Sequence, residues 1–256
     1  MIHIATISGG KDSVTMCDLL LKNGYQVDYI VFNDTLDEFK EMYEYLEKVE
    51  NYFKQRYGKL ITRLNPKKSY DEYIFHKKTS GENIGLISGV PSPTAGYCEW
   101  RRDSKLVPFE RWAKKFGEYK IYMGITRDEP NRIKRGSNFL YPLYDDFKMT
   151  ENDCKEYLIK QDMENPLYRH FNRTGCKKCQ YQSEKDWYMV WKNYQYVWKE
   201  LKDYEGRVAK LEAVNKNWFI GNKNSKDMER IFKSYEKQNS LFDLSAEPIK
   251  DCFCKI

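Results

Sequence analysis

Short apolar runs alternate with longer amphipathic stretches through the first two thirds of the chain. The runs are IHIATI (2–7), VDYIVF (27–32), KLITRL (59–64) and KIYMGI (120–125). Between them, helical patterns start at Lys11 and cross 36–53 and 103–116. Short, bounded, β-branched runs that alternate with helices are typical of parallel strands buried on both faces and joined by right-handed crossovers. The pattern therefore predicts an α/β fold.

The pattern changes after Thr150, which is placed to cap a helix with an acidic first turn. From Asn165 onward no convincing strand remains, and we expect a mostly helical C-terminal region. The predicted domains are residues 1–165 and 166–256. Within the second, Trp187, Trp191 and Trp198 recur at spacings typical of a helix that fills a core, which we favour over a surface that stacks nucleic-acid bases.

Three of the predicted strands end in turns rich in polar and charged residues. The first turn contains Ser8, Gly9, Gly10, Lys11, Asp12 and Ser13, and the others span 33–38 and 124–132. Ligands of parallel sheets bind beyond the carboxyl ends of the strands, so we expect the three turns to face one crevice. A glycine turn that opens a helix suits a phosphate, because unpaired N–H groups and the helix dipole attract anions. Ala5 and Asp12 exclude a Walker A loop.

Composition adds little about partners, because a net charge of +6 with 32% charged residues also fits an ordinary solvated surface. No apolar run reaches the ~18 residues that span a bilayer and no signal-peptide pattern is present, so we expect a cytoplasmic protein without a membrane partner.

The seven cysteines of a cytoplasmic protein are expected to be reduced. The pair Cys176 and Cys179 fits half a zinc site, iron–sulfur ligands or a redox dithiol. Cys98, Cys252 and Cys254 are further candidate sulfurs, whereas Cys17 and Cys154 fall in helical patterns and are expected to be buried.

Five stretches together resemble the PP-loop adenine-nucleotide α-hydrolase superfamily, in its phosphoadenosine-phosphosulfate reductase-like branch. They are SGGKDS, NDTLDEF, GITRDEPNR, YPLYDDFKMTENDCKEYL and NPLYRHFNRTGCKKC, in family order over residues 1 to 180. The resemblance implies a doubly wound, mainly parallel five-stranded sheet. It also implies nucleotide-binding residues, which are Ser8, Gly9, Gly10, Lys11, Asp12, Ser13, Asn33, Asp34, Thr35, Gly124, Ile125, Arg127, Glu129 and Arg132.

The resemblance implies an ATP pyrophosphatase that adenylates an acceptor and releases AMP and pyrophosphate, in the service of sulfur transfer. Lys11, Asp12, Ser13 and Asp34 would then act on ATP and Mg²⁺, and Cys98, Cys176 and Cys179 would hold a [4Fe-4S] cluster, with Zn²⁺ as the alternative. A sulfonucleotide reductase with Cys252 or Cys254 as nucleophile is the first alternative reading, and a non-catalytic nucleotide- or nucleic-acid-binding module is the second. The acceptor (nucleic acid or small molecule), a sulfur donor protein and a homodimer stay open.

Overall fold

The computed structural model describes residues 1–94, 96–134, 136 and 138–238. These residues form two compact units. We call residues 1–67 with 101–175 the sheet unit, and residues 68–100 with the described residues from Cys176 onward the helical unit. The division differs from the predicted domains in two ways: residues 68–100 group with the C-terminal part of the chain, and the segment 166–175 groups with the sheet.

The sheet unit is built on five parallel strands in the order β3-β2-β1-β5-β6. Their bounds are β1 (Ile2–Thr6), β2 (Tyr29–Asn33), β3 (Ile61–Leu64), β5 (Tyr119–Tyr122) and β6 (Phe139–Leu140). Four of these strands coincide with the apolar runs, which confirms the predicted α/β fold. The carboxyl ends of β2, β1 and β5 are neighbours, so the three polar turns leave the sheet side by side.

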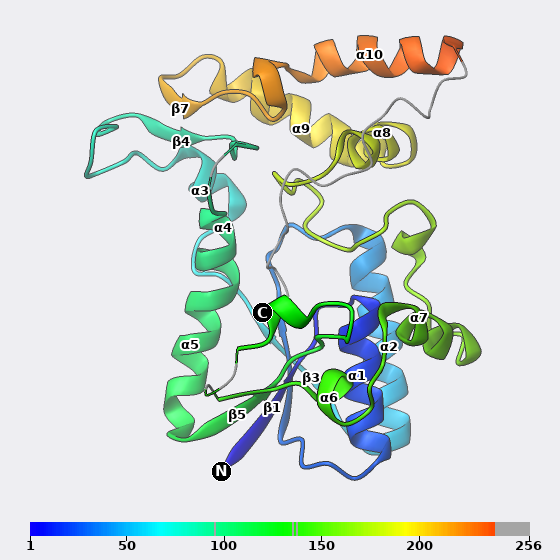
Figure 1. The fold of residues 1–256 in the computed structure, drawn as a ribbon. Coiled ribbons are helices and arrows are strands. Elements are labelled where there is room, and N and C mark those ends of the chain that lie inside the picture. The colour runs from blue at the N-terminus through cyan, green and yellow to red at the C-terminus, as the bar shows by residue number, and fades with distance from the viewer. Residues whose placement is uncertain (95, 135, 137, 239–256) are drawn as a thin grey trace. The chain divides into compact units, whose positions relative to one another are not determined.

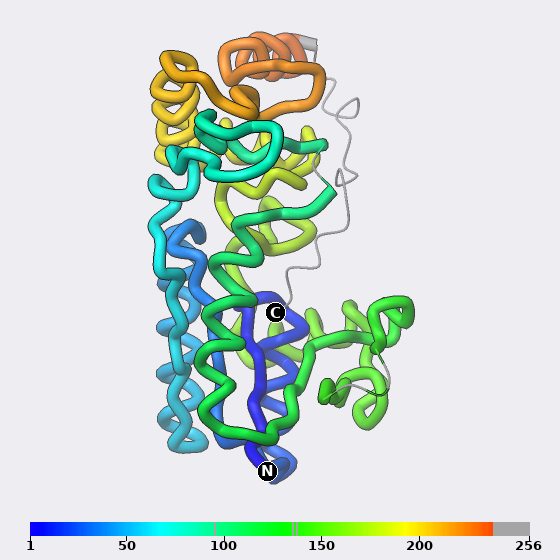
Figure 2. The backbone as a smooth tube through the Cα atoms, turned by 90° about the vertical axis from the view of Figure 1, so that its left-hand side faces the viewer, coloured from blue at the N-terminus to red at the C-terminus, as the bar shows by residue number. Residues whose placement is uncertain are grey.

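Helices cover both faces of this sheet. Its helical elements are α1 (Lys11–Lys22), α2 (Lys40–Tyr57), the π-helical turn η1 (Arg102–Leu106), α5 (Val107–Ala113), η2 (Lys114–Phe116), η3 (Pro130–Arg132), α6 (Pro142–Asp145), α7 (Glu151–Lys160) and η4 (Pro166–Arg169). In Figure 1, α1 and α2 lie on one side of the strands and α5 on the other. The view in Figure 2, turned by 90°, agrees, with α5 in front of the strands. The strand order requires this arrangement, because the chain leaves edge strand β3 and returns beside β1.

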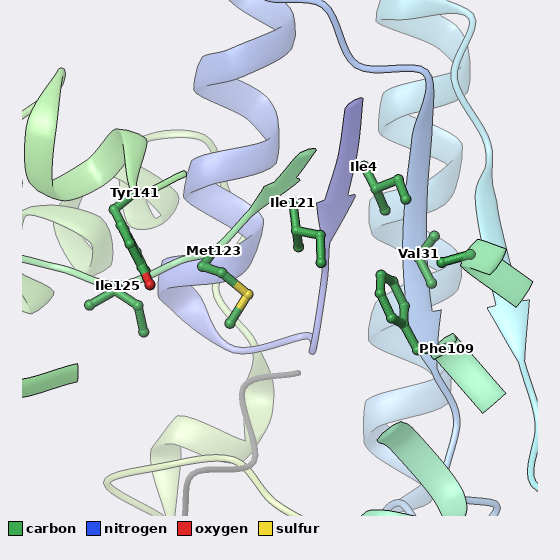
Figure 3. Packing of buried hydrophobic residues seen from close by; sticks show 8 residues of the cluster. Ile4, Val31, Phe109, Ile121, Met123, Ile125 and Tyr141 are labelled. Carbon is green, nitrogen blue, oxygen red and sulfur yellow. The ribbon is translucent and has the colours of Figure 1, made fainter. Parts of the chain in front are cut away.

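Apolar side chains from three central strands and α5 form the core on one face of the sheet. Ile4, Val31, Phe109 and Ile121 are at most 4% exposed and belong to one cluster, in which Ile125 also packs. Figure 3 shows these side chains converging from β1, β2, α5 and β5. The β-branched residues that identified the strands thus also fill the layer between sheet and helix.

Polar contacts fix α1 on the opposite face. Asp18 of α1 is 1% exposed. Its carboxylate accepts hydrogen bonds from the hydroxyls of Tyr57 at 2.7 Å and Tyr157 at 2.6 Å. A buried carboxylate is costly unless it is hydrogen-bonded, so these two bonds tie α1 to α2 and to α7. Cys17 and Cys154 are buried, as predicted. The hydroxyl of Thr150 accepts from the Asp153 N–H, which confirms the predicted cap of α7.

The helical unit consists of short elements around an aromatic core. They are α3 (Tyr70–Phe75), β4 (Ile87–Gly89), α4 (Glu99–Arg101), α8 (Glu184–Asn193), α9 (Gln195–Val208), β7 (Ala213–Asn215), η5 (Ile220–Asn222) and α10 (Ser225–Gln238). The last residue of α4, Arg101, belongs to the sheet unit. Trp187, Trp198 and Phe232 are at most 2% exposed, so the tryptophan spacing does reflect packing.

Two expectations for this region were wrong. The helix expected to carry Trp187, Trp191 and Trp198 is two helices, since Tyr194 leaves the helical conformation between α8 and α9. A strand also occurs after Asn165, where none was predicted: β7 pairs in parallel with β4 over three residues. Strands this short carry no readable alternation of apolar and polar positions. No helix among the described residues is long and apolar enough to cross a membrane.

Candidate functional site

The turn from Ser8 to Ser13 joins β1 to the N-terminus of α1. Gly9 has φ +75°, and the Met42 sulfur occupies the space that a Cβ would need, so only glycine fits there. The Ser13 hydroxyl donates to the Gly10 carbonyl at 2.9 Å and accepts from the Ser8 N–H at 3.1 Å. The side chain of Ser13 therefore holds the loop closed around the start of the helix, where α1 presents its positive end.

Lys11 carries a fixed positive charge at this helix end. Its ammonium lies 2.6 Å from a carboxylate oxygen of Glu151 and 3.9 Å from one of Asp12. Burial by itself lowers the pKa of Lys11, but the carboxylates of Asp12 and Glu151 favour the ammonium, and the pKa is raised above its ordinary value. Lys11 is therefore a cation throughout the neutral range.

Three carboxylates gather beside this cation. Oxygens of Asp12, Glu129 and Glu151 all lie within 4.8 Å of one another, which makes them the group of metal-ligand type found among the described residues. The turn after β5 is tied to the start of α7, because the Arg127 N–H donates to the Met149 carbonyl at 2.9 Å and the Glu151 N–H to Asp128 at 2.6 Å. These bonds bring the side chains of Glu129 and Glu151 to the phosphate loop.

Gly124 lets the end of β5 approach α1. A Cβ at this position would lie 2.9 Å from the Cα of Ser13 and 3.0 Å from its nitrogen, closer than side chains tolerate. The glycine thus serves the packing of two backbones. The side chain of Ile125 belongs to the hydrophobic core, so the predicted contact of this residue with a nucleotide could only involve its backbone.

The turn at 33–38 uses its polar side chains mainly on itself. Asp34 accepts from the Leu36 N–H at 2.7 Å and from the Tyr43 hydroxyl at 2.8 Å. Thr35 donates to Glu38 at 2.9 Å. Burial raises the pKa of Glu38, an effect that the ammonium of Lys105 opposes. These bonds give Asp34 and Thr35 a structural role in shaping the turn.

Two buried polar atoms near the strand ends have no hydrogen-bond partner within the part of the chain that the structure describes. They are the side-chain oxygens of Asn33, which ends β2, and of Thr126, four residues after β5. Asn33 is 3% and Thr126 0% exposed. A buried polar atom without a partner costs about 1–3 kcal/mol. Both atoms are therefore suited to bonding a ligand at this edge of the sheet.

The segment 165–175 closes over the phosphate loop. Asn165 is fully buried and donates from its amide to the Gly9 carbonyl at 2.8 Å. The Tyr168 hydroxyl accepts the Lys11 N–H at 2.9 Å. A Cβ on Gly10 would lie 3.2 Å from the Thr174 hydroxyl oxygen. We call residues 165–175 the strap.

The cysteines predicted to bind metal all belong to the helical unit. Cys176 and Cys179 are half-buried on one turn, in which the Cys179 N–H donates to the Cys176 carbonyl at 3.1 Å. The intervening Lys177 and Lys178 both pair with Glu200 of α9, at 2.7 and 3.0 Å. Lys178 is 3% exposed, and its ammonium lies 4.7 Å from the centroid of the Tyr70 ring. The turn is therefore firmly anchored.

Sequence reasoning identified most of the residues at the loop but missed several. Arg127 is exposed beyond β5, and Arg132 forms an ion pair with Glu129. Cys98 is half-buried just before α4, whereas Cys252 and Cys254 lie outside the described residues. The missed residues are Thr126, Glu151, Asn165, Tyr168 and Thr174. Only Asn165 carried a local signal, because asparagine before Pro166 is typical of a helix cap.

Comparison with known proteins identifies the family. The model of the phosphoadenosine phosphosulfate reductase domain matches residues 2–182, more than half of the chain. The chain belongs to this family. The phosphoadenosine phosphosulfate reductase domain thus covers the sheet unit and extends through the cysteine turn. A similar solved structure is the phosphate complex of phosphoadenylyl-sulfate (PAPS) reductase from Candida auris, with 18% identity and a TM-score of 0.47, over 69% of this chain and 81% of that one. No curated protein matches the chain.

Proposed function

We propose that the chain binds ATP with Mg²⁺ at the Ser8–Ser13 loop and transfers its adenylyl group to an acceptor. The observation that carries this proposal is the meeting of the phosphate loop, the Lys11 cation and three carboxylates at one helix end. Carboxylates alone would repel a polyanion. Together with a divalent cation they bind one, as magnesium sites for nucleoside phosphates do.

The carboxylate group fits a magnesium ion in chemistry and in spacing. Mg²⁺ prefers oxygen ligands at about 2.0–2.1 Å, so ligands on opposite sides of the ion lie roughly 4.2 Å apart. The oxygens of Asp12, Glu129 and Glu151, all within 4.8 Å of one another, need only a small adjustment to reach that span. These residues would hold the ion, which would offset charge on the phosphates.

The remaining chemistry is assigned to positioning. An oxygen of the acceptor attacks the α-phosphorus, the bond from that phosphorus to the bridging oxygen breaks, and pyrophosphate leaves with the bond's electron pair. Lys11 and the N–H groups at the start of α1 stabilise the negative charge on pyrophosphate. Asn33 and Thr126 offer their buried side-chain oxygens to the nucleotide.

The cysteines extend the proposal towards sulfur transfer. Thiolates are the ligands that iron–sulfur clusters and zinc prefer, and Cys98, Cys176 and Cys179 lie within one unit. They would hold the cluster, and sulfide-level sulfur that attacks the adenylated acceptor would displace AMP and complete the sulfur transfer. Zn²⁺, which the same thiolates would bind at about 2.3 Å, is the alternative.

A second function is supported by the family itself. A phosphoadenosine phosphosulfate reductase would bind a sulfonucleotide at the same loop. A thiolate would attack the sulfur, the bond from sulfur to the phosphate oxygen would break so that the nucleotide leaves, and a second thiol would release sulfite as a disulfide forms. The loop residues Ser8, Lys11 and Ser13 suit the phosphates of that substrate as well. The reductase reaction does not explain why three carboxylates lie at the loop, however. Because a Mg²⁺ ion bound with ATP does explain them, we favour the adenylation reaction.

Product analysis separates the two functions. We expect the full chain to convert ATP and Mg²⁺ to AMP and pyrophosphate when candidate acceptors are added, as measured by anion-exchange chromatography. In parallel, phosphoadenylyl sulfate and a dithiol reductant are supplied and sulfite is measured. ADP as the main product would reject the adenylation chemistry, and sulfite formation without any AMP from ATP would assign the reductase instead.

The metal role is tested with a matched pair on α7. Glu151→Gln should raise the Mg²⁺ concentration needed for ATP binding about tenfold or more, because it removes one of three charged ligands. Glu156→Gln changes an exposed carboxylate on the same helix and should have no effect. Equal magnesium dependence in both variants would remove Glu151 from the site. Isothermal titration calorimetry with ATP at fixed Mg²⁺ concentrations measures the difference.

A further inference from the structure

One side chain of the strap occupies a position where a phosphate oxygen would be expected. The Lys11 N–H is the first amide of α1 and has no acceptor within its own helix. Its acceptor is the Tyr168 hydroxyl, at 2.9 Å, from a residue 157 positions further along the chain. The Lys11 ammonium lies 5.3 Å from the centroid of the same ring. Both the amide and the cation of Lys11 thus face Tyr168.

The tyrosine is held there by its surroundings. Asn165 anchors the strap to the Gly9 carbonyl, and Leu167 is 1% exposed. The Thr174 side chain also hydrogen-bonds to Tyr168. The hydroxyl is therefore delivered to the loop by an ordered segment.

A phenol is a weak substitute for a phosphate at this position. Burial raises the pKa of Tyr168, although the neighbouring Lys11 opposes this effect, so the oxygen at the helix N-terminus is uncharged. Helix N-termini favour negative charge, and hydrogen bonds to an ionised acceptor are about twice as strong as those to a neutral one. A phosphate oxygen therefore outcompetes the hydroxyl, but only after that bond is broken.

We propose that Tyr168 is the resident occupant of the phosphate position and sets its affinity, because an incoming phosphate must displace the hydroxyl from the Lys11 N–H. This inference rests on anion binding at the loop, which is one part of the proposed function. It assigns to Tyr168 a role that opposes binding. A tyrosine that donated its own proton to the phosphate would favour binding, and the two roles predict opposite effects of removing the hydroxyl.

The test compares Tyr168→Phe with Tyr157→Phe, with pyrophosphate as the probe. Phenylalanine keeps the ring beside the Lys11 ammonium and removes only the acceptor. The apo protein loses a hydrogen bond that the complex does not contain, so pyrophosphate should bind about 2- to 12-fold more tightly, the range that corresponds to one net hydrogen bond. Tyr157→Phe removes a hydroxyl from Asp18 further along α1 and should leave the affinity unchanged.

Thermal melting adds a second readout. Tyr168→Phe should lower the melting temperature of the apo protein, and saturating pyrophosphate should shrink this deficit. Tyr157→Phe should lower the melting temperature equally with and without pyrophosphate. Weaker or unchanged pyrophosphate binding in Tyr168→Phe overturns the inference. Tighter binding in that variant without AMP formation by the wild type would uphold it while rejecting the adenylation chemistry, and a wild type that binds no pyrophosphate would overturn both.

Discussion

Removing the hydroxyl of Tyr57 should loosen the helix that begins at the phosphate loop. Tyr57 donates to Asp18 at 2.7 Å, and the carboxylate is 1% exposed. A hydrogen bond to a charged group contributes about 1.5–3 kcal/mol. Tyr57→Phe keeps the ring and removes this bond, so we expect the opening free energy of α1 to fall by about 2 kcal/mol. The Tyr157 hydroxyl still donates a hydrogen bond to the Asp18 carboxylate at 2.6 Å, so the carboxylate keeps one of its two tyrosine partners.

Native-state hydrogen exchange measures this change within the helix itself. A loss of about 2 kcal/mol corresponds to roughly 30-fold faster exchange of the buried α1 amides, because each 1.4 kcal/mol is a factor of ten. Tyr25→Phe is the matched control. Its hydroxyl bonds to Asp146 at 3.3 Å on an exposed surface, where the loss should stay below about 0.5 kcal/mol.

The part played by the charge is isolated by repeating the change in an Asp18→Asn background. Asparagine still accepts a hydrogen bond but carries no charge, so Tyr57→Phe should then cost about 1 kcal/mol. The difference between the two backgrounds is the coupling energy of the hydroxyl with the carboxylate. An identical cost in both backgrounds would refute the reasoning, since the hydroxyl would then be stabilising something other than a buried charge.

Three further predictions concern the site and the cysteine turn. Gly124→Ala should weaken pyrophosphate binding several-fold, because its Cβ would lie 2.9 Å from the Ser13 Cα; Gly175→Ala, with open space around it, should not, and equal affinities in a titration would contradict the close approach. Burial raises the pKa of Glu200, but Lys177 and Lys178 outweigh it and the net pKa is lowered, so this ion pair stabilises the fold above pH about 4.5 and is lost as pH falls. Glu200→Gln should therefore flatten the acid limb of a urea-denaturation series, and an unchanged slope would show that the pair contributes nothing. Finally, anaerobically purified protein should contain iron and sulfide, with less in Cys176→Ser and Cys179→Ser; metal analysis that finds equal iron in these variants would exclude the turn as a ligand.

The strands of the sheet were predictable where burial on both faces requires a continuous run of apolar residues. β1, β2 and β5 coincide with apolar runs because they lie inside the sheet with helices on both faces. Edge strand β3 also follows an apolar run, although Arg63 within it is exposed. β6 has only two residues and β4 and β7 three each, too few for any periodicity. The break at Tyr194 was also hidden, since apolar spacing continues across it while the backbone turns.

The residues of the candidate site likewise fall into those that the sequence could predict and those that it could not. The loop residues were predictable because glycine, lysine and serine meet local requirements of a turn at a helix N-terminus. Glu151 and Tyr168 were not, because each reaches the loop only after more than 130 residues of chain have folded back. Glu151 resembles any acidic residue in the first turn of a helix, and Tyr168 any tyrosine in a connecting segment. Their roles depend on contacts between distant parts of the chain, which no local sequence pattern indicates.

The interleaving of the two units constrains how the chain can be made and cut. Residues 68–100 are synthesised before β5 exists, yet their partners in the helical unit begin only at Cys176. During translation, α3 and β4 therefore emerge before the residues that they pack against, and the segment that follows them first completes the sheet. A fragment ending at Gly175 would contain the whole phosphate loop and strap but would leave the Tyr70 ring without Lys178 and Tyr204. Such a fragment would expose apolar surface that the full chain buries, so a truncation should also delete residues 68–100 and bridge the gap with a short linker.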